Sequence, residues 1–262
     1  MKKKMAVIVL TMAAISAMTT NALAEDLLTK IQEKGSITIA MEGDWAPWSF
    51  HDAESNEVIG YDADVARALA EKLGVKIEIV EAPWESLFAG LDSARYDLVI
   101  NGVEVTDERS EKYDFTDPYA YINTALIVRT DNEEITSFED LEGKKTVNSL
   151  ASTYMELAES YGATAVGVST LAETLTQVLQ GRADATLNAD VSFYDYMNQH
   201  PDAELKIVAT TEDPSLVAAV ARKGEETEKL LEELNAGLKE LQEDGTLKEL
   251  SEKYFGSDIS EK

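Results

Sequence analysis

The pattern of apolar and polar residues predicts alternating strands and helices in the first half of the chain. Apolar side chains recur at every fourth position at Val65, Leu69 and Leu73, and Gly74 follows as a helix stop. Short apolar runs between these helical stretches are typical of buried strands. The predicted helices are 27–33, 65–73 and 84–91, and the predicted strands are 36–40, 75–80 and 98–100. This alternation predicts an α/β fold with a mainly parallel sheet covered by helices.

A second α/β series occupies the rest of the chain. Its predicted strands are 125–128, 146–148, 163–168, 185–187, 205–208 and 216–220, and its predicted helices are 153–161, 171–180, 191–198, 225–243 and 246–255. The long helix 225–243 has one apolar stripe, formed by Leu230, Leu234, Leu238 and Leu241. Two successive α/β units of similar size, with no obvious flexible linker, predict two lobes with a cleft between them.

The first 24 residues have the three parts of a secretory signal peptide. A basic segment, Lys2 to Lys4, precedes the apolar run 5–18, and Ala22-Leu23-Ala24 is a cleavage motif. The apolar run is too short for a membrane span. We therefore predict cleavage after Ala24 and export of a soluble remainder.

The composition excludes several classes of function. The chain has 50 acidic and 23 basic residues, a net charge of −27, which argues against nucleic acids and anionic membranes as partners. It has no cysteine, which excludes disulfides, thiol catalysis, zinc–thiolate sites and lipid attachment at an N-terminal cysteine. His51 and His200 are isolated and fit no metal-binding motif, so we expect neither a metal nor a cofactor.

The stretch 97–109 carries the clearest candidate site. The buried strand 98–100 ends at Asn101-Gly102, and Thr106 is a plausible N-cap for a helix whose first turn carries Asp107 and Glu108. Ligands of open α/β folds bind just beyond such strand ends. Arg109 could place its guanidinium in that crevice and bind a carboxylate there with two hydrogen bonds. The alternative is an ordinary strand-to-helix connection with a surface arginine.

Seven stretches together resemble the polar amino-acid branch of the bacterial extracellular solute-binding proteins, the receptors that feed amino acids to ABC importers. They span nearly all of the chain after residue 24, in the order of the family. The stretches are Trp45-Ala-Pro-Trp48, Gly60-Tyr-Asp-Ala-Asp64, Val105-Thr-Asp-Glu-Arg109, Phe115-Thr-Asp-Pro-Tyr119, Leu141-Glu-Gly-Lys-Lys145, Gly181-Arg-Ala-Asp-Ala185, and Asp244-Gly-Thr-Leu247 ahead of Lys253-Tyr-Phe-Gly256.

The resemblance implies a type II periplasmic-binding-protein fold, in which two α/β lobes close on a ligand by hinge motion. The first lobe would be discontinuous and comprise residues 25–121 and 215–262. The second lobe would comprise residues 122–214. The two strands that cross between the lobes would lie near 121–126 and 210–216.

The resemblance also implies roles for individual residues. Arg109 would grip the α-carboxylate of an amino acid, and Asn101 and Gly102 lie where the family contacts the α-amino group. Trp45 and Trp84 occupy two aromatic pocket positions, although core packing is the commoner use of tryptophan. In the second lobe, the backbone N–H groups of Ser152 and Thr153 would help to hold the carboxylate. For Ser152 a plain helix N-cap is the alternative.

Two positions depart from the family pattern. Glu104 stands where the family usually carries Ser or Thr, and Ala189 stands where it carries the aspartate that binds the ligand ammonium. Our hypothesis is that Glu104 binds the ammonium instead, because a buried ammonium needs a charged partner. The alternatives are that Asp190, one residue later, does so, or that Glu104 is a solvated edge residue.

The candidate walls, which include Ser149, are uncharged and suit a polar or bulky uncharged amino acid better than a strongly basic one. The second lobe most resembles the cystine-binding subgroup, so cystine is the leading candidate. We expect a monomeric, periplasmic receptor whose partners are a free amino acid and an ABC permease. The alternatives are a dehydratase-like enzyme that uses Glu104 as a general acid, and a module that presents its ligand to a chemoreceptor.

Overall fold

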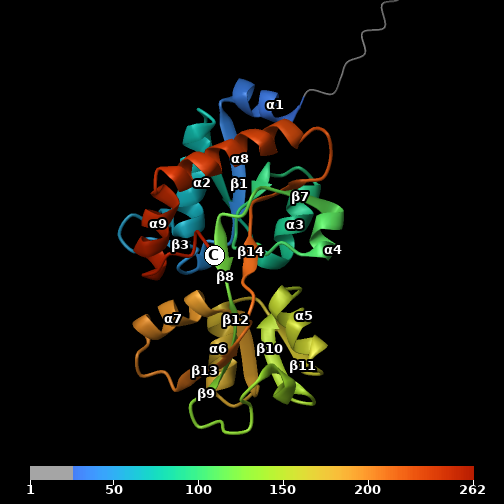
Figure 1. The fold of residues 1–262 in the computed structure, drawn as a ribbon, viewed down its shortest axis with the longest axis vertical. Coiled ribbons are helices and arrows are strands. Elements are labelled where there is room, and N and C mark those ends of the chain that lie inside the picture. The colour runs from blue at the N-terminus through green and yellow to red at the C-terminus, as the bar shows by residue number, and fades with distance from the viewer. Residues whose placement is uncertain (1–25) are drawn as a thin grey trace, which may run out of the picture.

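The computed structural model describes residues 26–262, which form two lobes stacked along the long axis of the molecule (Figure 1). The predicted signal peptide, residues 1–24, lies outside the described residues. Within residues 26–262, no helix is both long and apolar enough to cross a membrane.

The first lobe is built on a five-stranded sheet with the strand order β5-β1-β6-β15-β7. The strands are β1 (Ser36–Met41), β5 (Lys76–Glu81), β6 (Leu98–Val99), β7 (Tyr113–Phe115) and β15 (Val220–Arg222). The helices of this lobe are α1 (Leu27–Lys34), α2 (Tyr61–Lys72), α3 (Trp84–Asp92), α4 (Asp107–Lys112), α8 (Glu228–Glu243) and α9 (Thr246–Phe255).

The second lobe repeats this arrangement with the strand order β11-β10-β12-β9-β13. The strands are β9 (Thr124–Arg129), β10 (Lys145–Ser149), β11 (Thr164–Val168), β12 (Ala185–Ala189) and β13 (Leu205–Thr210). The helices are α5 (Thr153–Ser160), α6 (Leu171–Leu179) and α7 (Asp190–Gln199), with a 3-10 turn η1 (Phe138–Leu141).

The predicted α/β class is confirmed, and each sheet is mixed, with four strands running in one direction and one strand against them. In the first lobe β1 pairs in parallel with β5 and β6, whereas β15 is antiparallel to β6 and β7. In the second lobe β9 is antiparallel to both β12 and β13. Strands β9 and β15 lie next to the passages between lobes, and each runs against the other four strands of its sheet.

A two-stranded ribbon joins the lobes. It consists of β8 (Ala120–Ile122) and β14 (Ser215–Val217), which pair antiparallel and lie between the two sheets (Figure 1). The predicted single strand 216–220 is therefore two strands, β14 in the ribbon and β15 in the first sheet. The C-terminal segment adds to the ribbon, because the N–H of Tyr121 donates to the carbonyl of Ile259 at 2.7 Å.

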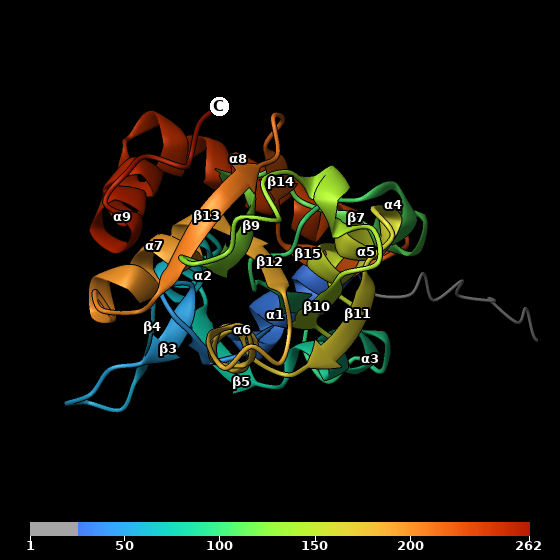
Figure 2. The same cartoon turned by 90° about the horizontal axis from the view of Figure 1, so that it is seen from below.

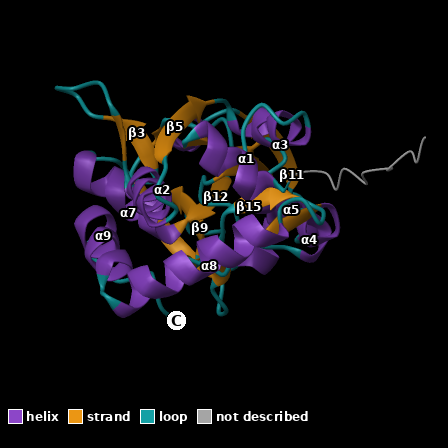
Figure 3. Ribbon diagram, turned by 90° about the horizontal axis from the view of Figure 1, so that it is seen from above, coloured by secondary structure: helices purple, strands orange, loops and turns teal. Residues whose placement is uncertain are grey.

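The segment after β1 forms a small sheet of β2 (Asp44–Trp45), β3 (Ser49–His51) and β4 (Val58–Ile59). The β3–β4 hairpin projects from the body of the molecule (Figures 2 and 3). The amphipathic pattern of the long C-terminal helix is confirmed, since Leu230, Leu234, Leu238 and Leu241 of α8 are all buried. Burial of this stripe holds α8 across the first lobe, where it contacts α2 (Figure 3).

Candidate functional site

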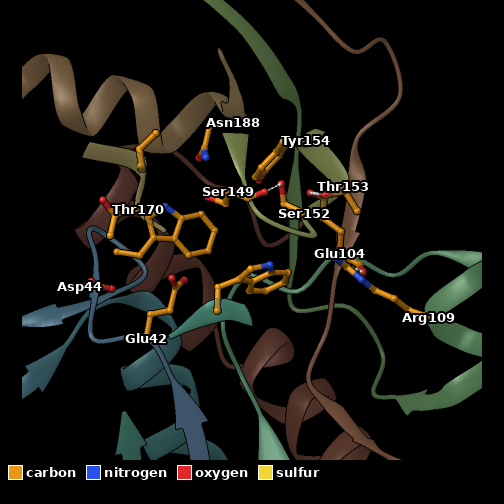
Figure 4. Close-up of a pocket in the computed structure, with 14 residues that line it drawn as sticks. Glu42, Asp44, Glu104, Arg109, Ser149, Ser152, Thr153, Tyr154, Thr170 and Asn188 are labelled. Atoms are coloured by element: carbon orange, nitrogen blue, oxygen red, sulfur yellow. Dashed lines mark hydrogen bonds between the residues drawn. The ribbon is translucent and has the colours of Figure 1, made fainter. Parts of the chain in front are cut away.

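A cavity of about 490 Å³ lies between the lobes and draws its lining from both (Figure 4). The first lobe contributes Glu42, Asp44, Trp45, Trp84, Gly102, Glu104 and Arg109, and the second contributes Ser149, Ser152, Thr153, Tyr154, Thr170, Leu171 and Asn188. The cavity thus brings together seven of the nine predicted site residues.

Arg109 enters the cavity from the short helix α4. Thr106 caps this helix, since its hydroxyl accepts from the Arg109 N–H at 3.1 Å, as the sequence predicted. The guanidinium lies 5.3 Å from the Trp84 ring centre and donates from Nη1 to the Glu104 carbonyl at 2.9 Å. Within residues 26–262, no carboxylate lies within ion-pair distance of Arg109.

Burial lowers the pKa of Arg109 from its ordinary value, but an arginine still carries its charge at neutral pH. A partly buried guanidinium without a carboxylate has unused donors arranged in a planar fork. Their natural partner is the carboxylate or another planar anion of a ligand.

Glu104 is buried, with 6% of its surface exposed, so the alternative of a solvated edge residue is wrong. Its backbone is held by a β-bridge to Val217 of the inter-lobe ribbon. Its carboxylate oxygen Oε1 accepts a hydrogen bond from the Thr153 hydroxyl at 2.6 Å. The carboxylate of Glu104 therefore belongs to the first lobe and contacts the edge of the second.

Gly102 permits close packing of Trp45 against the strand end. Its φ is +55°, a left-handed conformation, and an added Cβ would lie 2.6 Å from Trp45 Cζ3. Trp45 stacks on Trp48 with ring centres 5.4 Å apart, while its indole Nε1 is buried and has no hydrogen-bond partner among the described residues. Trp45 and Trp84 both face the cavity, as the sequence predicted.

Ser152 has the structural role that we considered as its alternative. Its hydroxyl caps α5 by accepting from the Met155 N–H at 3.2 Å, and it donates to the Ser149 carbonyl at 2.7 Å. The N-terminus of α5 nevertheless faces the cavity, so the free N–H groups of its first turn point toward it.

Asn101 and Asp190 are not brought into the cavity. Asn101 lies one position before Gly102, and its side chain makes two 2.8 Å hydrogen bonds with Glu42: the amide donates to the carboxylate, and the amide oxygen accepts from the Glu42 N–H. Asp190 begins α7 and accepts from the Val191 N–H at 2.8 Å. Asn101 therefore positions Glu42, which lines the cavity, and Asp190 organises the start of α7, but neither side chain lines the cavity itself.

The cavity is also more acidic than the sequence suggested, which corrects the expectation of uncharged walls. Glu42 and Asp44 lie at the end opposite Arg109 and Glu104 (Figure 4). Burial raises the pKa of Glu42 to about 7, and the nearby Asp44 and Glu85 add to that effect. Glu42 follows β1, so the strand-end rule that selected Asn101 would also have selected it.

The two lobes are in contact across the cleft. Besides the bond between Glu104 and Thr153, Trp48 Nε1 donates to Ser192 Oγ at 2.9 Å, and both of these side chains are fully buried. These bonds join residues of different lobes, so the structure has a closed arrangement.

Relatives of known name cover nearly the whole chain. The L-cystine-binding protein TcyA of Bacillus subtilis is 38% identical over 240 residues, which are 92% of this chain and 88% of the relative. A probable amino-acid ABC transporter-binding protein of Haemophilus influenzae is 36% identical over 261 residues, covering 100% of both chains.

Among solved structures, the L-cystine solute receptor of Neisseria gonorrhoeae in its unliganded open conformation is 39% identical, with 90% of this chain and 99% of the receptor covered. Its TM-score of 0.62 is modest for that identity, as expected when an open and a closed arrangement of two lobes are compared. The family model for bacterial extracellular solute-binding proteins, family 3, matches residues 37–257. The chain therefore belongs to this family of solute-binding proteins.

Proposed function

We propose that this protein is a periplasmic receptor that binds a free amino acid between its lobes and delivers it to an ABC importer. The observation that carries the proposal is the pairing of Arg109 with Glu104 in one cavity. A guanidinium without a carboxylate partner and a buried carboxylate lie at the same end of the cleft (Figure 4). An α-amino acid has the complementary pair of charges on the two groups attached to its α-carbon.

In this model the ligand carboxylate binds the free edge of the Arg109 guanidinium and the N–H groups at the start of α5. The ligand ammonium binds Glu104, which offsets the cost of burying that carboxylate. Trp45 and Trp84 form apolar walls around the remainder of the ligand. The groups that bind the carboxylate and the group that binds the ammonium belong to different elements of the fold. Only a ligand that carries both a carboxylate and an ammonium therefore satisfies the whole site.

Cystine is our leading ligand. Two of the relatives described above are named for L-cystine. The acidic end of the cavity, at Glu42 and Asp44, suits a second ammonium at the far end of the ligand. In a cystine the two α-carbons lie roughly 4.4–6.8 Å apart, so the second head would be within the same cavity.

The partners follow from the same role. An amino-acid receptor of this kind requires a permease, and the Haemophilus relative is named for an ABC transporter. The net charge of −27 disfavours nucleic acids and anionic membrane surfaces. We propose a monomer without catalytic activity that is exported by its N-terminal segment and not anchored by lipid.

The test is a thermal-shift panel of the standard amino acids and L-cystine, using protein unfolded and refolded to remove any ligand carried through purification. A ligand that binds only the native state raises the melting temperature, by an amount set by its concentration relative to Kd. We expect the largest rise with L-cystine. No rise with any amino acid would contradict the transport role, and turnover of a prephenate-like substrate would favour the dehydratase alternative.

A further inference from the structure

Tyr154 has a buried hydroxyl group that makes no hydrogen bond of normal geometry among residues 26–262. It is the second residue of α5, only 6% of its surface is exposed, and its side chain lines the inter-lobe cavity (Figure 4). A buried hydroxyl in this condition destabilises the fold unless something else binds it.

The other buried tyrosines of the described chain all use their hydroxyl groups. Tyr61 donates to the Tyr119 carbonyl at 2.7 Å, and Tyr119 donates to Asp62 at 2.7 Å. Tyr96 donates to the Leu87 carbonyl, and Tyr113 donates to Asp92. Tyr154 is the exception, and it is also the tyrosine that faces the cavity.

The surroundings of Tyr154 define what it can bind. Burial raises the pKa of the phenol well above its ordinary value, and the charge of Glu104 raises it further, so the phenol keeps its proton. The charge of Glu104 raises the pKa of the phenol by more than the charge of Arg109 lowers it. A neutral phenol can donate one hydrogen bond and accept another. Next to a carboxylate, its proton is attracted to that carboxylate and its lone pairs are left for a cationic donor.

We propose that the Tyr154 hydroxyl is a ligand contact that accepts a hydrogen bond from the α-ammonium bound by Glu104. The inference rests on the proposed function and adds a second-lobe residue to the recognition of the amino-acid head. An ammonium has three N–H donors, and one oxygen of Glu104 is already engaged by Thr153. Tyr154 supplies a further acceptor, and it does so only when its lobe is closed onto the ligand.

The decisive variant is Tyr154→Phe, because it removes the hydroxyl and keeps the ring. We expect the ligand-free melting temperature to change less than it does in Tyr96→Phe, because the Tyr154 hydroxyl is attracted to the Glu104 carboxylate but makes no hydrogen bond of normal geometry among residues 26–262. We expect the Kd for L-cystine to rise roughly tenfold, the effect of one lost hydrogen bond to a charged group. Calorimetric or fluorescence titration measures Kd, and differential scanning calorimetry measures the melting temperature.

Tyr96→Phe is the matched control. Its hydroxyl is bonded to the Leu87 carbonyl, away from the cavity, so this variant should lose stability and keep its affinity. If Tyr154→Phe behaves in the same way, the Tyr154 hydroxyl has a structural role and the proposal is overturned. If the wild-type protein binds L-cystine and Tyr154→Phe binds it equally well, only this inference fails; if the wild type binds no amino acid, the proposed function fails with it.

The ammonium assignment is tested by combining Tyr154→Phe with Glu104→Gln. If both groups hold the same ammonium, the loss of affinity in the double variant should be smaller than the product of the two single losses. Independent, multiplicative losses would mean that Tyr154 contacts another part of the ligand, and would overturn the assignment.

Discussion

The Glu104 carboxylate and the Thr153 hydroxyl lie 2.6 Å apart although they belong to opposite lobes. The contact joins the two lobes in the closed arrangement of the structure. Glu104 therefore has two partners in the proposed model, the ligand ammonium and the second lobe, and binding of one favours the other. We infer that it couples recognition of the ligand to closure.

The first prediction concerns Glu104→Ala. Removing one partner of a buried, hydrogen-bonded charge pair typically costs about 2–5 kcal/mol of binding free energy. We expect a loss of this size for the amino acid that gives the largest thermal shift, measured by titration calorimetry. The control is Asp190→Ala, which removes an acid outside the cavity and should keep the affinity. Normal binding by Glu104→Ala together with a loss in Asp190→Ala would assign the ammonium to Asp190 instead.

The second prediction concerns the shape of the Arg109 side chain. Lysine keeps the charge in Arg109→Lys, but it loses the planar fork and the packing of the guanidinium against Trp84. We expect affinity to fall by at least about 2 kcal/mol, because one partner of a buried charge pair is replaced by a poorly fitting one. Arg95→Lys, on the exposed surface of the same lobe, should bind normally. Equal affinities for both variants in titration calorimetry would show that the fork is not used.

The third prediction concerns Gly102→Ala. The new Cβ would lie 2.6 Å from Cζ3 of Trp45, so the indole must move into the cavity that it lines. Gly143→Ala is the matched control, because Gly143 has a similar φ of +72° and open space around its Cβ position. Both variants should lose about 1 kcal/mol of stability from the left-handed backbone. Only Gly102→Ala should also lose affinity, and unchanged ligand titration curves would contradict the role of Trp45.

The fourth prediction concerns pH and Glu42, whose pKa is raised to about 7, above the ordinary value of 4.5. A ligand ammonium nearby favours the charged carboxylate, so binding releases a proton from Glu42 near neutral pH. The affinity for L-cystine should therefore rise as pH increases from about 6 to 8. Titration calorimetry in buffers of different ionisation enthalpy measures the released proton. Glu42→Gln should abolish both the release and the pH dependence, whereas a persistent release would assign it to another group.

The same raised pKa also affects stability. Because the pKa of Glu42 is higher in the folded state, this group contributes stability at pH below 4.5 that is lost as pH rises through about 7. The buried Asp62, whose pKa burial also raises to about 7, acts in the same direction. Thermal melts of ligand-free Glu42→Gln should accordingly fall less steeply over this pH range than melts of the wild type.

Local patterns in the sequence predicted much of the fold, because strand, helix and cap signals are carried by neighbouring residues. The strand before Asn101 and the Thr106 cap predicted that Arg109 lies beside a crevice at the strand end. The reversed direction of β9 and β15 was missed, since it depends on how the chain passes between the lobes rather than on the composition of those strands.

The direction of a side chain at a strand end was harder to predict. Asn101 and Gly102 are adjacent, yet only Gly102 borders the cavity, because both lie in a bend beyond β6 and the Asn101 side chain is bonded to Glu42. Tyr154 was missed for a related reason. In the sequence, Tyr154 is one of several buried-type residues of a helix. Only the packing of that helix against β12 shows that its hydroxyl is buried beside the cleft.

The last prediction concerns the bond between Trp48 and Ser192, which joins the lobes outside the residues that line the cavity. In Ser192→Ala the indole N–H has no partner in the closed form, but it can be hydrated in the open form. We therefore expect the closed form to lose about 1–3 kcal/mol relative to the open form. Ligand dissociation, followed by stopped-flow tryptophan fluorescence, should become faster by at least fivefold.

Because Ser192 does not touch the cavity, every ligand should lose affinity by the same factor, and the ranking of amino acids should not change. Ser160→Ala provides the control, since its hydroxyl bonds to the Leu157 carbonyl on the exposed surface of the second lobe. A changed ranking in Ser192→Ala would mean that Ser192 acts on the ligand site. An unchanged dissociation rate would mean that the bond does not contribute to closure, and the affinity would then be set within the cavity alone.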